Sequence, residues 1–127
     1  MTDKIFATAI NCIDGRAQLP VIEWLKRQCG VDYVDMITEP GPERLLAEAK
    51  DLTACASIRR RLEISINRHN SNLVAIAGHH DCAGNPADKE TQLGQILTAI
   101  KTVESWKCKV EVIGLQVNEN REVSKVN

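Results

Sequence analysis

Aromatic residues are scarce in this sequence: Phe6, Trp24, Tyr33 and Trp106 are the whole supply among 127 residues. Recognition of single-stranded nucleic acid depends on exposed aromatic side chains on which bases stack, so a base-stacking function is set aside. The chain also lacks an excess of charge of one sign, because 16 Lys and Arg residues face 17 Asp and Glu residues. We therefore expect no electrostatic preference for nucleic acid or for a membrane surface.

Long apolar runs are also missing. No stretch approaches the roughly 20 residues that a membrane-spanning helix needs, and the first residues lead into a strand-like run instead of a signal peptide. The five cysteines are an odd set without C-x-x-C pairs, which argues against a disulfide framework and for reduced thiols, some of which could bind metal. We predict a cytoplasmic protein with a single domain over residues 1–127.

Short apolar runs alternate with amphipathic stretches along the chain. Strand-like composition occurs in five stretches, 5–10, 31–37, 73–77, 110–117 and the short 122–126. Helical periodicity occurs in three stretches, 19–29, 43–69 and a segment that follows Asn85-Pro86 and extends to about Val103. Such an alternation predicts βαβ units. The expected fold class is α/β, with a mostly parallel central sheet of about four strands plus a short C-terminal strand and helices on both faces.

Proline, glycine and capping residues predict where the helices begin and end. Pro20 is expected near the first turn of the 19–29 helix, and Gly30 after its last residue. Asn85 is expected to cap the helix that begins at Pro86. A break of the 43–69 helix is possible near Thr53.

A polar stretch with two metal-binding residue types follows the third predicted strand. His79 and Cys82 are three positions apart and can present an imidazole nitrogen and a thiolate sulfur to one metal ion, for which zinc fits best. Cys12 follows the first predicted strand, so it reaches the same edge of the sheet if the two strands are neighbours. A Cys2His set leaves a fourth position for water or substrate, as in a catalytic zinc site.

Asp14 and Arg16 add charged groups beside Cys12. In an extended segment these three residues project to one side, because the side-chain period of a strand is two. An aspartate next to a zinc-bound water can accept its proton or a hydrogen bond, and an arginine keeps that aspartate ionised. A simpler interpretation stays open, in which Asp14 and Arg16 form only a turn-stabilising ion pair. His80 is either a proton shuttle at the rim or a solvent-facing neighbour.

The motifs Cys12-x-Asp14-x-Arg16 and His79-x-x-Cys82 resemble the zinc-site signature of the β-class carbonic anhydrases. The resemblance implies zinc on Cys12, His79 and Cys82, with Asp14 and Arg16 as the neighbouring catalytic pair. It also implies a zinc lyase that hydrates carbon dioxide reversibly to bicarbonate by metal-bound hydroxide. The expected partners are this small substrate and other copies of the chain, in a homodimer or a higher homo-oligomer.

Alternatives remain open at the level of sequence. After the second predicted strand, Thr38-Glu39-Pro40-Gly41 replaces the loop that is usual in the β-class family. The same ligands also serve hydrolysis of carbon disulfide or carbonyl sulfide, so a related zinc hydrolase is one alternative. A catalytically inactive relative, with zinc closed by Asp14, is another. The third is a protein without metal in which Cys12 and Cys82 act by thiol redox chemistry.

Overall fold

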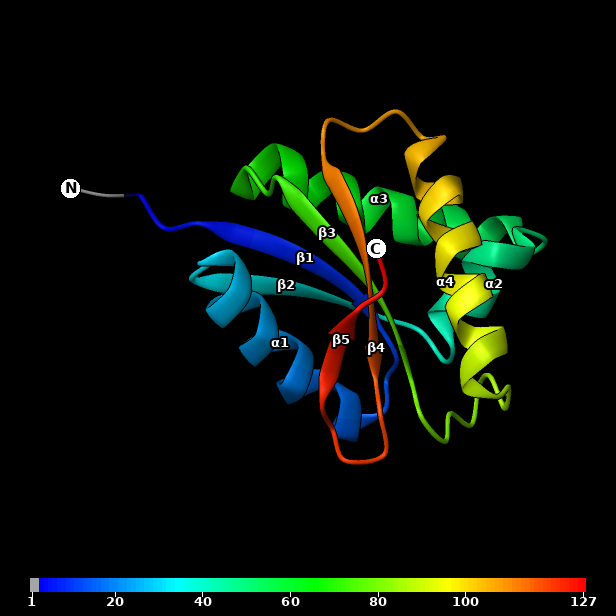
Figure 1. Ribbon diagram of the computed structural model, residues 1–127. Coiled ribbons are helices and arrows are strands. Elements are labelled where there is room, and N and C mark those ends of the chain that lie inside the picture. Colours follow the sequence, from blue (N-terminus) through cyan, green and yellow to red (C-terminus); the bar gives the residue numbers. More distant parts are fainter. Residues whose placement is uncertain (1–2) are drawn as a thin grey trace.

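The computed structural model describes residues 3–127, which form a central sheet with helices on both sides (Figure 1). The strands are β1 (Phe6–Asn11), β2 (Tyr33–Thr38), β3 (Leu73–His79), β4 (Glu111–Val117) and β5 (Val123–Lys125). The helices are α1 (Gly15–Cys29), α2 (Pro42–Glu48), α3 (Leu52–His69) and α4 (Lys89–Glu104). The strand order is β2-β1-β3-β4-β5, in which the first four strands run parallel and β5 runs antiparallel to β4. The predicted fold class is confirmed.

The two faces of the sheet bury separate apolar cores because successive residues of a strand point to opposite sides. All seven residues of β3 are buried, and the apolar ones from Leu73 to Ala77 alternate between the two cores. One core contains Ala75 of β3 with Val21 and Leu25 of α1. The other contains Ile76 of β3 and is covered by apolar residues of α2, α3 and α4. The sheet is therefore enclosed by helices on both faces.

Helix α1 begins at Gly15, earlier than the predicted start at 19. The cause is Asp14, whose carboxylate accepts a hydrogen bond from the Arg16 backbone N–H at 2.9 Å and so caps the helix. Pro20 consequently lies inside α1 and not in its first turn. The prediction that Asp14 and Arg16 belong to an extended segment is wrong, since Arg16 lies in the first helical turn.

The predicted 43–69 helix is two helices, and their separation lies just before the predicted break at Thr53. Ala49 ends α2 in the left-handed region at φ 52°, and the Asp51 carboxylate accepts from the Ala54 N–H at 3.0 Å to begin α3. Within residues 3–127, no helix is long and apolar enough to cross a membrane.

Helix α4 begins at Lys89, so the prediction that Asn85 caps a helix starting at Pro86 is wrong. The capping side chain is that of Asp88, which accepts from the Thr91 N–H at 2.8 Å. The Asn85 side chain is buried instead and donates to Gln95 Oε1 at 2.7 Å. The residues between β3 and α4 therefore form a turn that is tied to α4 by side chains.

The loop after β2 packs directly against the turn after β3. Gly41, at φ 59°, and Gly84 meet backbone to backbone, because a Cβ added at Gly84 would lie 2.6 Å from the Pro40 carbonyl carbon and 2.9 Å from the Gly41 nitrogen. Only hydrogen atoms fit between the two segments at this point. The unusual sequence of the loop after β2 thus fixes the position of the turn that carries Cys82.

Candidate metal centre

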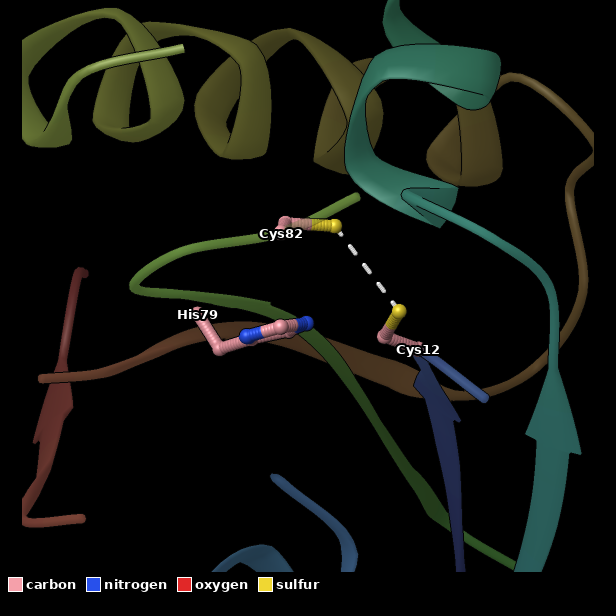
Figure 2. Close-up of side chains that lie close together, drawn as sticks. All are labelled: Cys12, His79 and Cys82. Atoms are coloured by element: carbon pink, nitrogen blue, oxygen red, sulfur yellow. Dashed lines mark hydrogen bonds between the residues drawn. The ribbon is translucent and has the colours of Figure 1, made fainter. Parts of the chain in front are cut away.

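Cys12, His79 and Cys82 lie together where β1 and β3 end (Figure 2). The condition for this convergence is met, because β1 and β3 are adjacent parallel strands. Their register pairs Thr8 with Val74, and the same offset places Cys12 level with Gly78, one residue before His79. The carboxyl ends of two neighbouring strands therefore bring the predicted side chains to one place.

The three possible ligand atoms form a tight buried group. All lie within 4.8 Å of one another, and the two sulfur atoms are 3.8 Å apart. Each of the three residues is about 3% exposed. Figure 2 shows both thiols and the imidazole directed toward one another. Two sulfurs and one nitrogen are the donor types that zinc prefers, and three protein ligands leave one position open.

The hydrogen bonding of His79 defines which ring nitrogen is available. Nδ1 lies 2.8 Å from the carbonyl oxygen of His80, and since a carbonyl only accepts, Nδ1 carries the proton. The lone pair is then on Nε2. Within residues 3–127, His79 Nε2 is one of three buried side-chain polar atoms without a hydrogen-bond partner. An unpartnered buried nitrogen that faces two thiols fits a bound metal ion.

The thiol of Cys82 has to lose its proton before it can bind a metal ion. Two causes raise the pKa of Cys82 to about 11: burial, which has the larger effect, and the neighbouring Cys12. Without a positive charge nearby, the buried thiol stays protonated at neutral pH. Metal binding releases such protons, because the thiolate and not the thiol is the ligand.

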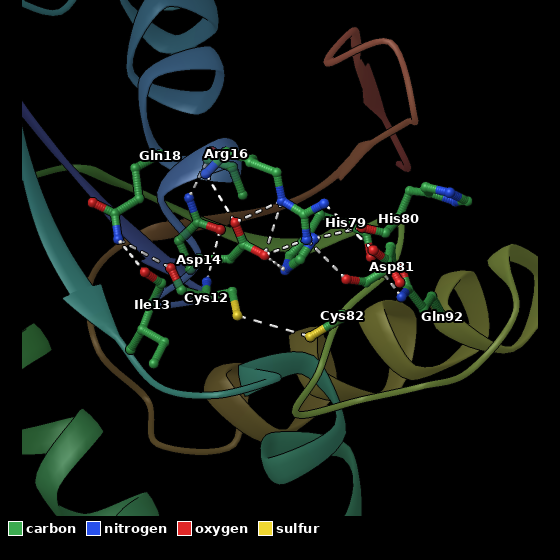
Figure 3. Close-up of polar contacts among 12 residues, drawn as sticks. Cys12, Ile13, Asp14, Arg16, Gln18, His79, His80, Asp81, Cys82 and Gln92 are labelled. Carbon is green, nitrogen blue, oxygen red and sulfur yellow. Dashed lines mark hydrogen bonds and ion pairs between the residues drawn. The ribbon is translucent and has the colours of Figure 1, made fainter.

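Asp14 and Arg16 lie beside this group and are firmly paired (Figure 3). Arg16 donates from Nε to Asp14 Oδ1 at 3.0 Å and from Nη2 to Oδ2 at 2.6 Å. These side-chain hydrogen bonds hold the pKa of the Asp14 carboxyl well below its usual range. Arg16 also donates to the carbonyl oxygen of Asp81 at 3.1 Å, so it links the turn after β1 to the turn after β3. Asp14 Oδ2 is 3.9 Å from His79 Nε2.

The model of one protein family, described as "Putative carbonic anhydrase", matches residues 2–127. The chain belongs to this family. No curated protein matches it. The match covers nearly the whole chain and confirms the resemblance that the two motifs predict. A buried Cys/His/Cys group thus occurs in a member of a carbonic anhydrase family.

Solved structures of β-carbonic anhydrases are similar to this chain. One, from a study of two tetrameric enzymes of the filamentous ascomycete Sordaria macrospora, has 12% sequence identity and a TM-score of 0.58, over 97% of this chain and 81% of that chain. The β-carbonic anhydrase CafA of Aspergillus fumigatus has 14% identity and a TM-score of 0.49, over 96% of this chain and 76% of that chain. The first of these likenesses shows that the fold is that of a β-carbonic anhydrase.

Asn11 contributes to the centre of this carbonic anhydrase family member, although sequence reasoning gave it no role. Its Oδ1 accepts from the Cys12 N–H at 2.8 Å, and its Nδ2 donates to the Ala17 carbonyl at 3.0 Å. Asn11 is fully buried at the end of β1. A polar residue that ends an otherwise apolar buried strand is the signal that indicates such a role.

Two cavities lie on either side of the 79–82 turn. The smaller, about 30 Å³, is lined by residues that include Arg16 and His79. The larger, about 580 Å³, is lined by residues that include Cys82, Gln92 and Gln116. His80 is exposed, borders both cavities and has Glu119 Oε2 3.9 Å from its Nδ1. The candidate metal centre is thus buried, and one of its residues lines each cavity, His79 the smaller and Cys82 the larger.

Glu43 is a second buried group that sequence reasoning missed. It is fully buried in α2, and a Cβ added at Gly78 would collide with its Oε2. Within residues 3–127, both of its carboxylate oxygens are without hydrogen-bond partners. Burial raises the pKa of Glu43 above its ordinary value of about 4.5, and the nearby Asn85 side chain opposes only part of this rise. The folded protein therefore holds the Glu43 proton more tightly than the unfolded chain does.

Glu43→Gln is expected to have a higher free energy of unfolding than the native protein, and the difference is expected to grow as the pH rises above about 4.5. As the pH rises, the unfolded chain loses the Glu43 proton before the folded protein does. The free energy of unfolding of the native protein therefore falls by up to about 1.4 kcal/mol per pH unit, until the raised pKa of the folded state is reached. Glutamine has no proton to lose. Urea unfolding at a series of pH values measures the difference between the two proteins.

The matched control is Glu48→Gln, at an exposed carboxylate on the same helix. Glu48→Gln removes an exposed ion pair with Arg44, so it should change the free energy of unfolding by no more than about 0.5 kcal/mol. A difference between Glu43→Gln and the native protein that stays constant with pH would contradict the raised pKa.

Proposed function

We propose that this protein is a zinc enzyme that hydrates carbon dioxide reversibly to bicarbonate. The proposed ligands are the sulfurs of Cys12 and Cys82 and the Nε2 atom of His79. The observation that supports this most is the buried Nε2 atom, which has no partner within residues 3–127 and belongs to a group whose ligand atoms all lie within 4.8 Å of one another. Membership of the carbonic anhydrase family supports the reaction class.

The protein residues supply the orientation and the proton acceptor in this proposal. A zinc ion held there acts as a Lewis acid and lowers the pKa of a water molecule from 15.7 to about 7. Asp14 is ionised and held by hydrogen bonds from the backbone N–H, Nε and Nη2 of Arg16, so it can accept a hydrogen bond or a proton from a water beside His79. The His80 carbonyl holds Nδ1 of His79, which keeps the proton off Nε2.

We also propose that the protein is a homo-oligomer. Ile13 and Leu19 lie near the site and are about 58% and 60% exposed, although both are large apolar side chains. Contact with a second copy of the chain would cover them. The similar structures from Sordaria macrospora are tetrameric by their description.

Stopped-flow measurement of carbon dioxide hydration with a pH indicator tests the proposed reaction. Zinc-loaded protein is expected to accelerate hydration with a rate that rises between about pH 6.5 and about pH 9, because a zinc-bound water ionises in that range. A rate no better than that of buffer would overturn carbon dioxide hydration. Turnover of carbonyl sulfide or carbon disulfide by the same sample would then assign a different small substrate to the same centre.

A second candidate function follows from the position of Asp14, whose Oδ2 is only 3.9 Å from His79 Nε2. If Asp14 were a fourth ligand, the centre would be closed and the protein would be a catalytically inactive relative. Arg16 opposes this closure, because it occupies both carboxylate oxygens. The open centre is therefore the better-supported state.

Asp14→Asn is expected to leave zinc affinity within about twofold of the native value while it lowers the rate of hydration, because Asp14 acts as an acceptor and not as a ligand. Competition with a chromophoric chelator measures the affinity. Asp81→Asn is the control, since it removes a second negative charge beside Arg16, at 3.4 Å from Nη1, from a carboxylate that is 74% exposed. A tenfold or greater loss of zinc affinity in Asp14→Asn alone, about 1.4 kcal/mol, would favour the closed centre.

A further inference from the structure

We propose that Gln92 is a positioning residue for the metal centre, and that its amide fixes the peptide on which the orientation of His79 depends. This inference rests on the proposed zinc site. Gln92 lies on α4, is 1% exposed, and donates from Nε2 to the carbonyl oxygen of His79 at 2.7 Å. Its role is separate from ligand binding, because it contacts the backbone of the ligand residue and not the imidazole.

Both polar groups of the His79–His80 peptide unit are held. The His80 N–H donates to the Val117 carbonyl of β4 at 2.9 Å, and the His79 carbonyl accepts from Gln92. The next carbonyl along the chain, that of His80, accepts from His79 Nδ1 at 2.8 Å. A rotation of the peptide unit would move the His80 carbonyl and with it the imidazole. Gln92 therefore sets the direction of Nε2 through the backbone.

Gln116 supports the orientation of the Gln92 amide that the His79 carbonyl requires. Its Nε2 lies 3.4 Å from Gln92 Oε1, and it is 3% exposed on β4. If the Gln92 amide were reversed, two oxygens would face each other at His79 and two NH₂ groups would face each other at Gln116. The pair thus has one favourable arrangement, in which the donor faces the His79 carbonyl.

The composition of this buried cluster indicates a role beyond packing. Gln92 and Gln116 are buried amides beside Ile96 and the apolar core of α4. A buried amide costs free energy unless it is hydrogen-bonded, and an apolar side chain of similar size avoids this cost. The hydrogen bond of Gln92 goes to the backbone of His79, the residue whose Nε2 atom has no partner. Outer hydrogen bonds that orient a ligand are typically worth 10- to 100-fold in metal affinity.

Zinc affinity of purified Gln92→Leu, measured by chelator competition, tests the inference. The expected result is a roughly 10- to 100-fold loss of affinity, with a changed visible spectrum of the cobalt-loaded protein, because the ligand geometry is altered. The control is Thr102→Val on the same helix, which removes a side-chain hydrogen bond of 2.8 Å to the Leu46 carbonyl, away from the ligand turn. Thr102→Val is expected to lose about 1 kcal/mol of stability and no zinc affinity.

Failure of this inference is distinguishable from failure of the proposed function. If the native protein binds no zinc, the proposed function fails. If the native protein binds zinc and Gln92→Leu binds it equally well with an unchanged cobalt spectrum, the positioning role is overturned. Should Gln92→Leu not fold, Gln116→Leu serves instead, because it leaves the Gln92 donor in place but removes its orienting partner. For Gln116→Leu, a measurable loss of zinc affinity, expected to be smaller than tenfold, supports the inference. An unchanged zinc affinity overturns it.

Discussion

Cys12→Ser is expected to abolish zinc binding and carbon dioxide hydration together. Serine replaces a soft thiolate ligand with a hydroxyl that stays protonated at neutral pH, so only Cys82 and His79 remain to hold the ion. The loss of affinity should exceed the roughly 100-fold that removal of an outer hydrogen bond can cause. Metal content after dialysis and stopped-flow hydration, measured on the same sample, check this result.

The control for this substitution is Cys29→Ser. Cys29 is an exposed thiol at the end of α1 and lies outside the metal centre. This variant should retain both zinc and activity. If Cys12→Ser still hydrates carbon dioxide, the proposed ligand set is wrong. If Cys12→Ser still binds zinc but does not hydrate carbon dioxide, Cys12 is not needed to hold the metal.

Gly84→Ala is expected to reduce the free energy of unfolding by roughly 2–3 kcal/mol, at the upper end of the range for overpacking. A Cβ at this position would lie 2.6 Å from the carbonyl carbon of Pro40 and 2.7 Å from its Cβ. These atoms belong to a proline and its backbone, so they cannot rotate away as a flexible side chain would. The turn that carries Cys82 must move, and zinc affinity should fall as well. Urea unfolding of the metal-free protein measures the change in stability.

Gly94→Ala is the matched control, because a Cβ at Gly94 meets nothing within 4 Å. Gly94 lies inside α4, where alanine is expected to stabilise the helix by about 0.5–1 kcal/mol. The two glycine substitutions should thus change stability in opposite directions. Equal stability of Gly84→Ala and the native protein would show that the contact between the loops after β2 and β3 does not limit the fold.

Much of the site could be predicted because its residues follow strands directly. Cys12 comes after an apolar strand, as does the turn with His79 and Cys82, and parallel strands bring their carboxyl ends to one edge. Sequence alone left one condition open, namely that β1 and β3 are neighbours. That adjacency depends on long-range pairing, which no local pattern encodes. The structure meets the condition.

The helix starts were harder to predict because two capping signals competed. Pro20 favoured a start of α1 that is too late, and Pro86 favoured a start of α4 that is too early. The observed starts are determined by the carboxylates of Asp14 in α1 and Asp88 in α4. An aspartate that accepts a backbone N–H is recognised only when its side chain is seen to turn toward the helix. The difference matters for function, because the cap at Asp14 is also what brings Arg16 to its carboxylate.

The supporting residues could not be predicted because buried amides look like surface residues in a helical pattern. The apolar side chains of α4 at helical spacing include Leu93 and Leu97, yet Leu97 is 43% exposed while Gln92 and Ala99 are buried. The buried face is shifted by about one position around the helix. Gln92 enters this face because the His79 carbonyl needs a donor there, a requirement set by tertiary structure.

The sulfurs of Cys12 and Cys82 are 3.8 Å apart, but the residues are separated by 70 positions in the chain. A metal ion between them would close a loop that contains more than half of the 127 residues. A metal bridge of this kind opposes the separation of β1 from β3, because Cys12, which follows β1, must release the ion before the strands part. The centre of the sheet would then open no more often than Cys12 releases the ion, and during synthesis the site cannot form until Cys82, after β3, has emerged.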